Sequence, residues 1–248
     1  MRSTAVRRPP SWQLATVIEL VQETPRTKSI VLDLQDRMDH RPGQHVDLRV
    51  IREDGHLPQR SYSIASAPED DCVMLTVERI DGGEVSSYLV DELRCGDKLE
   101  IRGPVGSDFT WDGAVEHPLL LVAGGPGIVP IRSMLRCHAL TRSSAPVRLV
   151  CSAPSLDELI YRDELLLISA RDEMDVSVTL SREQAAGWRG YRGRVGRELL
   201  EEVGWPPEHQ PLVYVSGPTG FVEAAAEALV ALGHEPGRIR TERFGRAR

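Results

Sequence analysis

Residues 119–130 read LLLVAGGPGIVP, and this stretch decides how the second half of the chain is expected to fold. An uninterrupted apolar run is typical of a strand that is buried on both faces of a parallel sheet. The glycines that follow allow a tight turn, and the residues after Ile128 repeat apolar side chains with helical periodicity. A buried strand, a glycine-rich turn and a helix, in this order, predict the opening unit of an α/β sheet.

The glycine-rich turn also predicts a binding site. Backbone N–H groups at the start of a helix attract anions, and glycines let a ligand approach the backbone closely. We therefore interpret Gly124, Gly125, Gly127 and Ile128 as the binding site for the pyrophosphate of a dinucleotide. The spacing is not G-x-G-x-x-G, so a purely structural strand-to-helix turn is the alternative.

Strands and helices continue to alternate after this unit, which predicts a Rossmann-like parallel sheet covered by helices on both faces. The later strands are expected at residues 147–151, 175–180, 212–215 and 239–243, and the helices at 128–140, 156–169, 195–203 and 220–232. Ligands of such sheets collect at the carboxyl ends of the strands. A second strand-to-helix corner, Gly217, Pro218, Thr219 and Phe221, is therefore expected to face the same crevice.

Two arginines follow the third strand of this half and suggest which nucleotide is bound. Arg182 comes directly after the strand, and Arg194 lies in the loop before the next helix. A guanidinium group can hold a phosphate through two parallel hydrogen bonds, so these residues favour the 2′-phosphate of NADPH, with NADH possible. Solvent-exposed loop arginines are the alternative interpretation.

The first half of the chain has a different pattern, in which short β-rich runs are separated by turn residues. Six such runs between residues 12 and 107 predict a small antiparallel barrel. One of them, residues 60–66, reads RSYSIAS, and it combines a phosphate-binding fork at Arg60, a flat ring at Tyr62 and a small hydroxyl at Ser63. These groups suit a flavin nucleotide, and an edge strand with a solvated arginine is the alternative.

A helix is expected in the barrel half at about residues 85–93, after the glycine pair that ends at Gly83. Its amino end is suited to a phosphate, and Ser86 adds a hydroxyl donor there. A simple helix cap is the alternative, and the two roles are compatible. With Arg60, this helix start would hold the flavin diphosphate from two sides.

Composition excludes several classes of function. The chain has 248 residues and a net charge of −7, which does not suit nucleic acid or an anionic membrane surface. No apolar run has the length of a membrane span, and the first residues lack the apolar core of a signal peptide. We expect a mobile tail at residues 1–11, a flavin domain at 12–113 and a nucleotide domain at 114–248.

The cysteines and histidines predict no metal site. Cys72, Cys95, Cys137 and Cys151 do not have the spacing of zinc or iron–sulfur ligands, and the seven histidines are scattered. We interpret the cysteines as reduced, mostly buried thiols of a cytoplasmic protein.

Together these motifs resemble those of the ferredoxin–NADP reductase superfamily, in particular its two-domain flavin reductases and the reductase components of oxygenases. The resemblance covers about residues 12–245. The family's motifs P-G-Q, R-x-Y-S, G-x-x-S, G-P-x-G and G-G-x-G-I-x-P stand, in family order, at residues 42–44, 60–63, 83–86, 103–106 and 124–130.

The resemblance implies FAD as the cofactor, in preference to FMN, and a set of site residues. Ser63, Tyr62 and Glu242 would lie at the reacting part of the flavin ring. FAD contacts are implied for Arg60, Ser61, Tyr62, Ser63, Val77, Gly83, Val85, Ser86 and Phe244. NAD(P) contacts are implied for Gly124, Gly125, Gly127, Ile128, Ser152, Arg182, Arg194, Gly217, Pro218, Thr219 and Phe221.

The chain departs from the family pattern at two places that bear on the nucleotide. Ser216 stands where the family often has cysteine, and Ser152 is followed by Ala153 and Pro154 where many members carry an arginine.

The resemblance also implies a reaction. Hydride would pass from NAD(P)H to the flavin, and electrons would then leave to a separate acceptor, a ferredoxin or an oxygenase component. A flavin-bearing electron-transfer or regulatory subunit and an NAD(P)H:free-flavin reductase are the alternatives.

Overall fold

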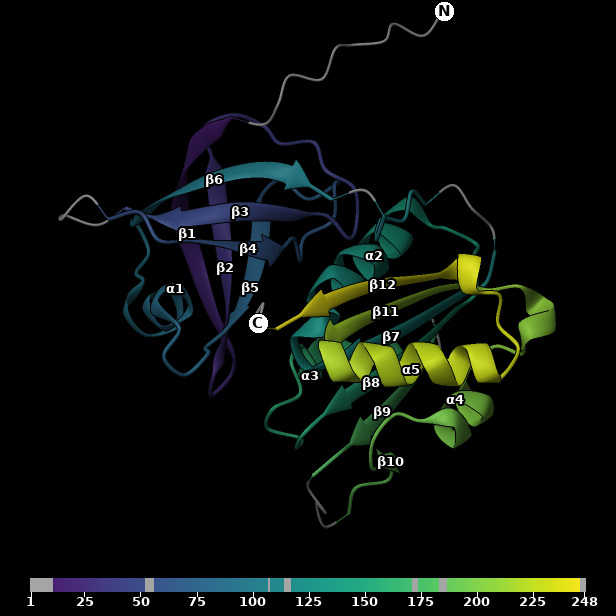
Figure 1. Cartoon of the computed structure of the whole chain (residues 1–248). Helices are drawn as coiled ribbons and strands as arrows, with labels where there is room; N and C mark the ends of the chain where they lie inside the picture. The colour runs from purple at the N-terminus through teal and green to yellow at the C-terminus, as the bar shows by residue number, and fades with distance from the viewer. Residues whose placement is uncertain are drawn as a thin grey trace, which may run out of the picture.

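The computed structural model describes residues 11–51, 56–106, 108–113, 117–170, 174–182 and 187–245. It contains an antiparallel six-stranded sheet followed by a parallel six-stranded sheet, which form two lobes (Figure 1). This architecture confirms the predicted fold class. Residues 1–10 of the expected tail and residue 114, the expected start of the second domain, lie outside the described residues.

The first sheet is ordered β4-β3-β6-β1-β2-β5 and closes into a barrel. Its strands are β1 (Trp12–Thr24), β2 (Thr27–Leu34), β3 (His45–Val50), β4 (Gln59–Ser63), β5 (Val73–Glu78) and β6 (Lys98–Val105). Just after β4, Ile64 bridges Leu75 of β5, so the two edge strands meet. Alternation along β3 places Val46, Leu48 and Val50 in the barrel core.

The expected barrel helix is present as α1 (Glu84–Ser87), which continues as a π-helical turn (Tyr88–Glu92). Val85 and Leu89 bury this segment against the barrel core.

The second sheet is ordered β10-β9-β8-β7-β11-β12. Its strands are β7 (Leu119–Gly124), β8 (Val147–Ala153), β9 (Asp175–Leu180), β10 (Tyr191–Arg192), β11 (Leu212–Pro218) and β12 (Ile239–Phe244). The helices are α2 (Ile128–Thr141), α3 (Arg162–Ala170), α4 (Arg197–Val203) and α5 (Thr219–Ala231), with 3-10 turns at Gly125–Gly127, Pro207–His209 and Pro236–Arg238. No helix of the described residues is long and apolar enough to cross a membrane.

The central strand β7 is buried on both faces, as its apolar sequence predicts. Leu119 and Leu121 pack in the same cluster as Met134 of α2, whereas Leu120 packs with Leu229 of α5 on the opposite face. Helices therefore cover both faces of the sheet, and α5 lies in front of it in Figure 1.

One predicted boundary is wrong, and one short strand was not predicted. The helix expected from residue 156 begins only at Arg162, because Tyr161 has a left-handed backbone (φ 59°) that interrupts any helix. The short strand β10 was not expected, since two residues are too few to show a periodicity. The thiols are all free, as expected, but only Cys137 and Cys151 are buried.

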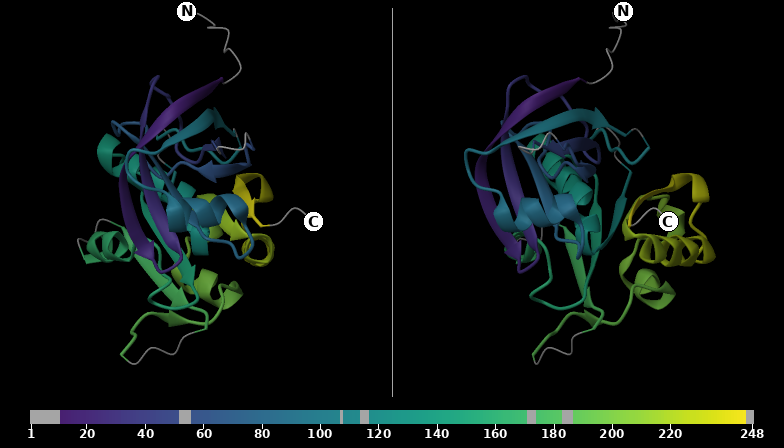
Figure 2. Two further views of the ribbon diagram at one scale, coloured as in Figure 1. Left: turned by 90° about the vertical axis from the view of Figure 1, so that its left-hand side faces the viewer. Right: turned by 60° about the vertical axis from the view of Figure 1, so that its left-hand side comes forward.

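The two lobes are joined by α2, which packs against the loop after β4. Ser133 Oγ donates to the carbonyl oxygen of Ser66 (2.6 Å), and Arg132 Nη1 donates to that of Ala65 (3.1 Å). Ala65 and Ala67 belong to the same apolar cluster as the buried side of α2. Figure 2 shows from two other directions that the barrel and the α/β half meet along this seam.

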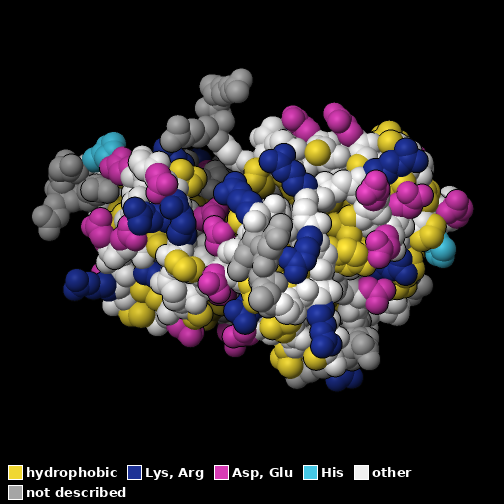
Figure 3. Space-filling view, turned by 90° about the horizontal axis from the view of Figure 1, so that it is seen from below, with side chains coloured by type: hydrophobic (Ala, Val, Ile, Leu, Met, Phe, Trp, Pro, Cys, Tyr) yellow, Lys and Arg dark blue, Asp and Glu magenta, His cyan; other side chains and the backbone are white. Residues whose placement is uncertain are grey.

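The face of the molecule seen from below carries both signs of charge. Seen from below, Lys and Arg side chains and Asp and Glu side chains are interspersed over both lobes, with hydrophobic side chains in small groups (Figure 3).

The seam includes an ion pair whose loss should destabilise the protein. Arg136 Nε donates to Asp70 Oδ2 (2.9 Å), and the backbone N–H of Ala67 donates to the same oxygen (2.8 Å). Burial alone would raise the pKa of Asp70, but these hydrogen bonds outweigh it and lower the pKa. Because the folded-state pKa is depressed, the stabilisation is present near neutral pH and is lost as the pH falls through that pKa.

We expect Asp70→Asn to lower the free energy of unfolding by about 1–3 kcal/mol at pH 7 and by much less in strong acid. Urea unfolding of the variant and of the wild type across this pH range measures the difference. Asp71→Asn, at the exposed neighbouring position, is the control and should have little effect. Equal losses in the two variants would contradict the role of the ion pair.

Candidate functional site

A crevice of about 500 Å³ opens between the two lobes at the carboxyl ends of β7, β8 and β11. On the α/β side, its lining residues include Gly124, Gly125, Ser152, Pro218 and Phe221. On the barrel side, it is lined by the turn between β1 and β2 and by Glu78 at the end of β5. Segments far apart in the sequence thus form one site, as expected for the carboxyl edge of a parallel sheet.

The glycines of the two strand-to-helix corners have different tasks. A Cβ on Gly127 would lie 2.0 Å from the carbonyl oxygen of Ser216, so this position is required for the corners to pack together. A Cβ on Gly124 would lie 2.7 Å from the ring of Phe221. Gly125 has a φ of 52° and lines the crevice, and a Cβ at this position would meet no atom within 4 Å.

The predicted nucleotide ligands therefore divide into two sets. Gly124 and Gly125 present backbone to the crevice, whereas Gly127 and Ile128 are buried beneath it. Gly217, with a φ of 153°, packs on Gly124.

Four buried side-chain polar atoms have no hydrogen-bond partner among the described residues. Three of them, Ser63 Oγ, Ser216 Oγ and Glu242 Oε2, lie where the lobes meet, and the fourth is Trp111 Nε1. Ser216 and Glu242 are register neighbours on β11 and β12. Ser63 comes from the end of β4, and its hydroxyl lies close enough to influence Glu242 although no regular hydrogen bond joins them. Buried polar atoms are normally paired, so this cluster fits a polar ring bound between the lobes.

Burial determines the acidity of Glu242. It raises the pKa of the Glu242 carboxyl to about 7, against a smaller lowering effect of the Ser63 hydroxyl. The carboxyl can therefore gain or lose a proton near neutral pH.

Arg60 and Tyr62 on β4 differ in exposure. Arg60 is exposed, and among the described residues its guanidinium donates only to the carbonyl oxygen of Gln59 (2.6 Å), which leaves donors for an anion. Tyr62 packs against the barrel core beside its register partner Val46, and burial raises the pKa of its phenol. In the loop before β4, His56 lies 3.5 Å from Glu84 of α1, so the loop and the helix start are neighbours.

Several predicted flavin ligands have side chains that are already engaged. Ser61 is exposed, and its Oγ donates to Asp47 Oδ1 (2.7 Å) on the outer surface of the barrel. Ser86 Oγ accepts from the backbone N–H of Ile80 (3.1 Å) and donates to the carbonyl oxygen of Gly83 (3.3 Å), so it holds the turn that precedes α1.

Two predicted flavin contacts, both valines, have side chains that cannot reach a ligand. Val77 and Val85 lie in the barrel core, so only their backbones can reach a ligand.

The remaining predicted residues are not among those that line the crevice. Arg182 and Arg194 are exposed and do not line it, although Ser181, beside Arg182, does. Thr219 is exposed at the start of α5, and Phe244 ends β12.

The sequence analysis missed the barrel side of the crevice and part of the loop after β8. The turn between β1 and β2 resembles any hairpin turn, and no sequence signal shows that it faces a distant domain. The missed residues are Thr24, Pro25, Arg26, Glu78, Ala153, Pro154, Ser155, Glu158, Ile160 and Ser181. Ser216 stood out only as a departure from the family pattern.

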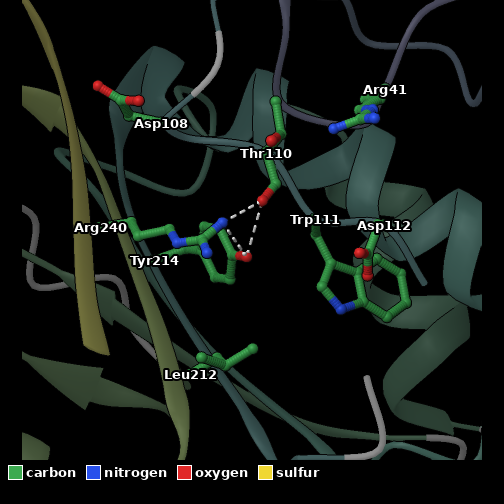
Figure 4. Close-up of a pocket in the computed structure, with 8 residues that line it drawn as sticks. All are labelled: Arg41, Asp108, Thr110, Trp111, Asp112, Leu212, Tyr214 and Arg240. Atoms are coloured by element: carbon green, nitrogen blue, oxygen red, sulfur yellow. Dashed lines mark hydrogen bonds between the residues drawn. The ribbon is translucent and has the colours of Figure 1, made fainter. Parts of the chain in front are cut away.

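A second cavity, of about 460 Å³, lies near the amino ends of β11 and β12, opposite the crevice (Figure 4). Within it Tyr214 Oη donates to the carbonyl oxygen of Thr110 (3.0 Å), and Arg240 donates to the same oxygen. These bonds tie the segment after the barrel to the parallel sheet at the edge away from the crevice.

Comparison with known proteins identifies both halves of the chain. Residues 14–110 match the model of the oxidoreductase FAD-binding domain, and residues 121–227 match that of the oxidoreductase NAD-binding domain. Among solved structures, the flavohem-like FAD/NAD-binding domain of nitric oxide dioxygenase from Vibrio cholerae O1 biovar El Tor is similar with a TM-score of 0.85 and 27% identity, over 96% of this chain and all of that one.

Similar proteins of known name show to which family the chain belongs. The glycine betaine monooxygenase reductase subunit of Pseudomonas aeruginosa (strain UCBPP-PA14) is 32% identical over 94% of this chain, which spans only 64% of that relative's length. Ferredoxin–NADP reductase B of Sorangium cellulosum (strain So ce56) is 36% identical over 82% of this chain and 84% of its own. With both domains in this order, the chain belongs to the ferredoxin–NADP reductase superfamily.

Proposed function

We propose that the protein is an FAD-dependent NAD(P)H oxidoreductase, with FAD bound by residues 12–113 and the nicotinamide nucleotide by residues 114–248. When bound, FAD supplies the acceptor for a hydride and passes the electrons on. The observation that carries this proposal is the group of buried, unpartnered polar atoms on Ser63, Ser216 and Glu242 where the lobes meet.

The residues around this group would each have a limited task. Ser63 would hydrogen-bond the flavin ring, and Tyr62 would pack against it. Glu242, whose pKa of about 7 results from burial, would hold or release a proton beside the ring. Arg60, exposed and without a carboxylate partner among the described residues, would bind the flavin phosphates. Exclusion of water by the closed seam would strengthen each of these interactions.

On the nucleotide side, the backbone N–H groups of Gly124 and Gly125 would hold the pyrophosphate in the crevice. Phe221 and Pro218 would border the nicotinamide end. Arg182, exposed beside the crevice residue Ser181, supports a preference for NADPH. Arg194, also exposed, is the second candidate for the 2′-phosphate.

We propose that the electrons pass to a ferredoxin-type protein or an oxygenase component in the cytoplasm. Two relatives that match most of this chain support this acceptor. They are a glycine betaine monooxygenase reductase subunit and the ferredoxin reductase component of 3-ketosteroid-9-alpha-monooxygenase.

Mixing the FAD-loaded protein with NADPH or NADH in the absence of air tests the central step. We expect the flavin absorbance to bleach, because hydride reaches the ring, and to bleach faster with NADPH. Stopped-flow absorbance measures both rates. If neither nucleotide bleaches the flavin, the chain is not a reductase, and a purely electron-transferring or regulatory flavin subunit becomes the better explanation.

Arg182→Ala should raise the KM for NADPH about tenfold and leave that for NADH little changed, because one phosphate-binding guanidinium is lost. Steady-state kinetics with both nucleotides measure the ratio. Arg189→Ala, another exposed arginine of the same region, is the control. An equal effect of Arg182→Ala on the two nucleotides would show that it does not contact the 2′-phosphate.

Glu242→Gln should remove a titration from the pH profile of flavin reduction, because the wild-type carboxyl has a pKa of about 7. At pH values between the ordinary pKa of a glutamate and 7, Glu242 is protonated in the folded wild type but not in the unfolded chain. The free energy of unfolding of the wild type therefore falls as the pH rises through this range. The variant should not show this fall, which amounts to at most about 3 kcal/mol. Glu227→Gln, on the exposed side of α5, is the control, and an unchanged profile in Glu242→Gln would contradict the assignment.

A further inference from the structure

A chain of hydrogen bonds between side chains crosses from the α/β half into the barrel. Tyr161 Oη donates to Thr76 Oγ1 (2.5 Å), Thr76 Oγ1 lies 2.8 Å from Ser29 Oγ, and Ser29 Oγ donates to Glu23 Oε1 (2.6 Å). Since Ser29 gives its one proton to Glu23, Thr76 must donate to Ser29. Every proton therefore points toward the Glu23 carboxylate, and such an ordered series strengthens each bond in it.

The hydroxyl groups of this hydrogen-bond series are almost completely shielded from water. Tyr161 and Thr76 are each 5% exposed, and Ser29 is fully buried. A buried hydroxyl that loses its partner is costly, because water cannot replace it. This series of hydrogen bonds is therefore expected to connect the two lobes firmly.

This connection joins the two segments that carry the walls of the nucleotide crevice. Glu23 directly precedes residues 24–26, the hairpin turn that lines the barrel side. Tyr161 directly follows Ile160, which with Glu158 lines the α/β side. The hydrogen-bonded hydroxyl groups thus link the two walls of the crevice.

Tyr161 is itself held firmly. Its left-handed backbone (φ 59°) is uncommon for a bulky residue and persists only where the surroundings impose it. Arg132 lies over its ring at 4.8 Å from the centroid. The same guanidinium donates to Glu164 Oε2 (2.7 Å) and to the carbonyl oxygen of Ala65 (3.1 Å). These contacts direct the phenol into the barrel.

We propose that Tyr161 is a positioning residue which, through Thr76, Ser29 and Glu23, sets the width of the crevice and thereby the placement of the nicotinamide nucleotide against the flavin. This inference rests on the proposed function. Hydride transfer requires the two rings in close contact, so a small widening of the crevice should slow the reaction strongly.

The structure offers a matched control in Tyr214. Its Oη also crosses between the halves, to the carbonyl oxygen of Thr110 (3.0 Å), and it is also buried. It lies in the cavity on the opposite edge of the sheet, away from the crevice (Figure 4). Tyr214→Phe therefore removes a comparable donated hydrogen bond, together with the one that Tyr214 Oη accepts from Arg240 (3.2 Å), without touching either wall.

The first experiment compares flavin reduction in FAD-loaded Tyr161→Phe and Tyr214→Phe. At saturating nucleotide, Tyr161→Phe should be reduced about ten- to hundredfold more slowly, with a larger primary deuterium isotope effect from deuterated nucleotide. Tyr214→Phe should stay within about twofold of the wild type, since the crevice walls keep their spacing. Ser29→Ala should reproduce the slow rate, and the double variant Tyr161→Phe/Ser29→Ala should be no slower than either, because the chain is already cut.

The second experiment is hydrogen–deuterium exchange without nucleotide. Tyr161→Phe should speed exchange at residues 22–27 and 158–161, and Tyr214→Phe at 108–112. Hydrogen–deuterium exchange does not need NAD(P)H. If NAD(P)H fails to reduce the wild type, the proposed function is refuted, but the exchange rates still test whether Tyr161 connects the two walls of the crevice. Similar rates and exchange in Tyr161→Phe and Tyr214→Phe would overturn the inference.

Discussion

The contact on which the rest of the structure depends is the seam between α2 and the loop after β4. Ser66 is central to it, because its carbonyl oxygen accepts from Ser133 Oγ (2.6 Å) and lies 3.1 Å from His40 Nε2. Ser63, three residues earlier, is thereby held against Glu242 from the other lobe. Neither lobe alone contains the polar cluster, so the candidate site exists only while this seam is closed.

The site combines a rigid frame with polar atoms that the frame leaves unsatisfied. Close packing of Gly127 on the backbone of Ser216 brings the two strand-to-helix corners together. The same burial removes water from Ser63, Ser216 and Glu242 and raises the pKa of Glu242 to about 7. A bound ring would give these atoms the partners that the protein does not provide.

The agreement between sequence and structure is best where one segment carries its own pattern. The apolar run 119–124, its glycine turn and α2 are where the periodicity puts them. Sequence and structure disagree where contacts between residues far apart in the chain determine the local conformation. The helix expected from residue 156 begins only at Arg162, because Tyr161 is held against the barrel with a left-handed backbone.

The sequence by itself determined the two sheet types, their order and the glycine corners, because alternation, apolar runs and turn residues are local properties. Only the tertiary structure decided which side chains face the crevice. The hairpin turn at residues 24–26 and the hydroxyl of Tyr161 acquire their roles from contacts between lobes. Such contacts join residues far apart in the chain, and they leave no periodicity that a sequence pattern can reveal.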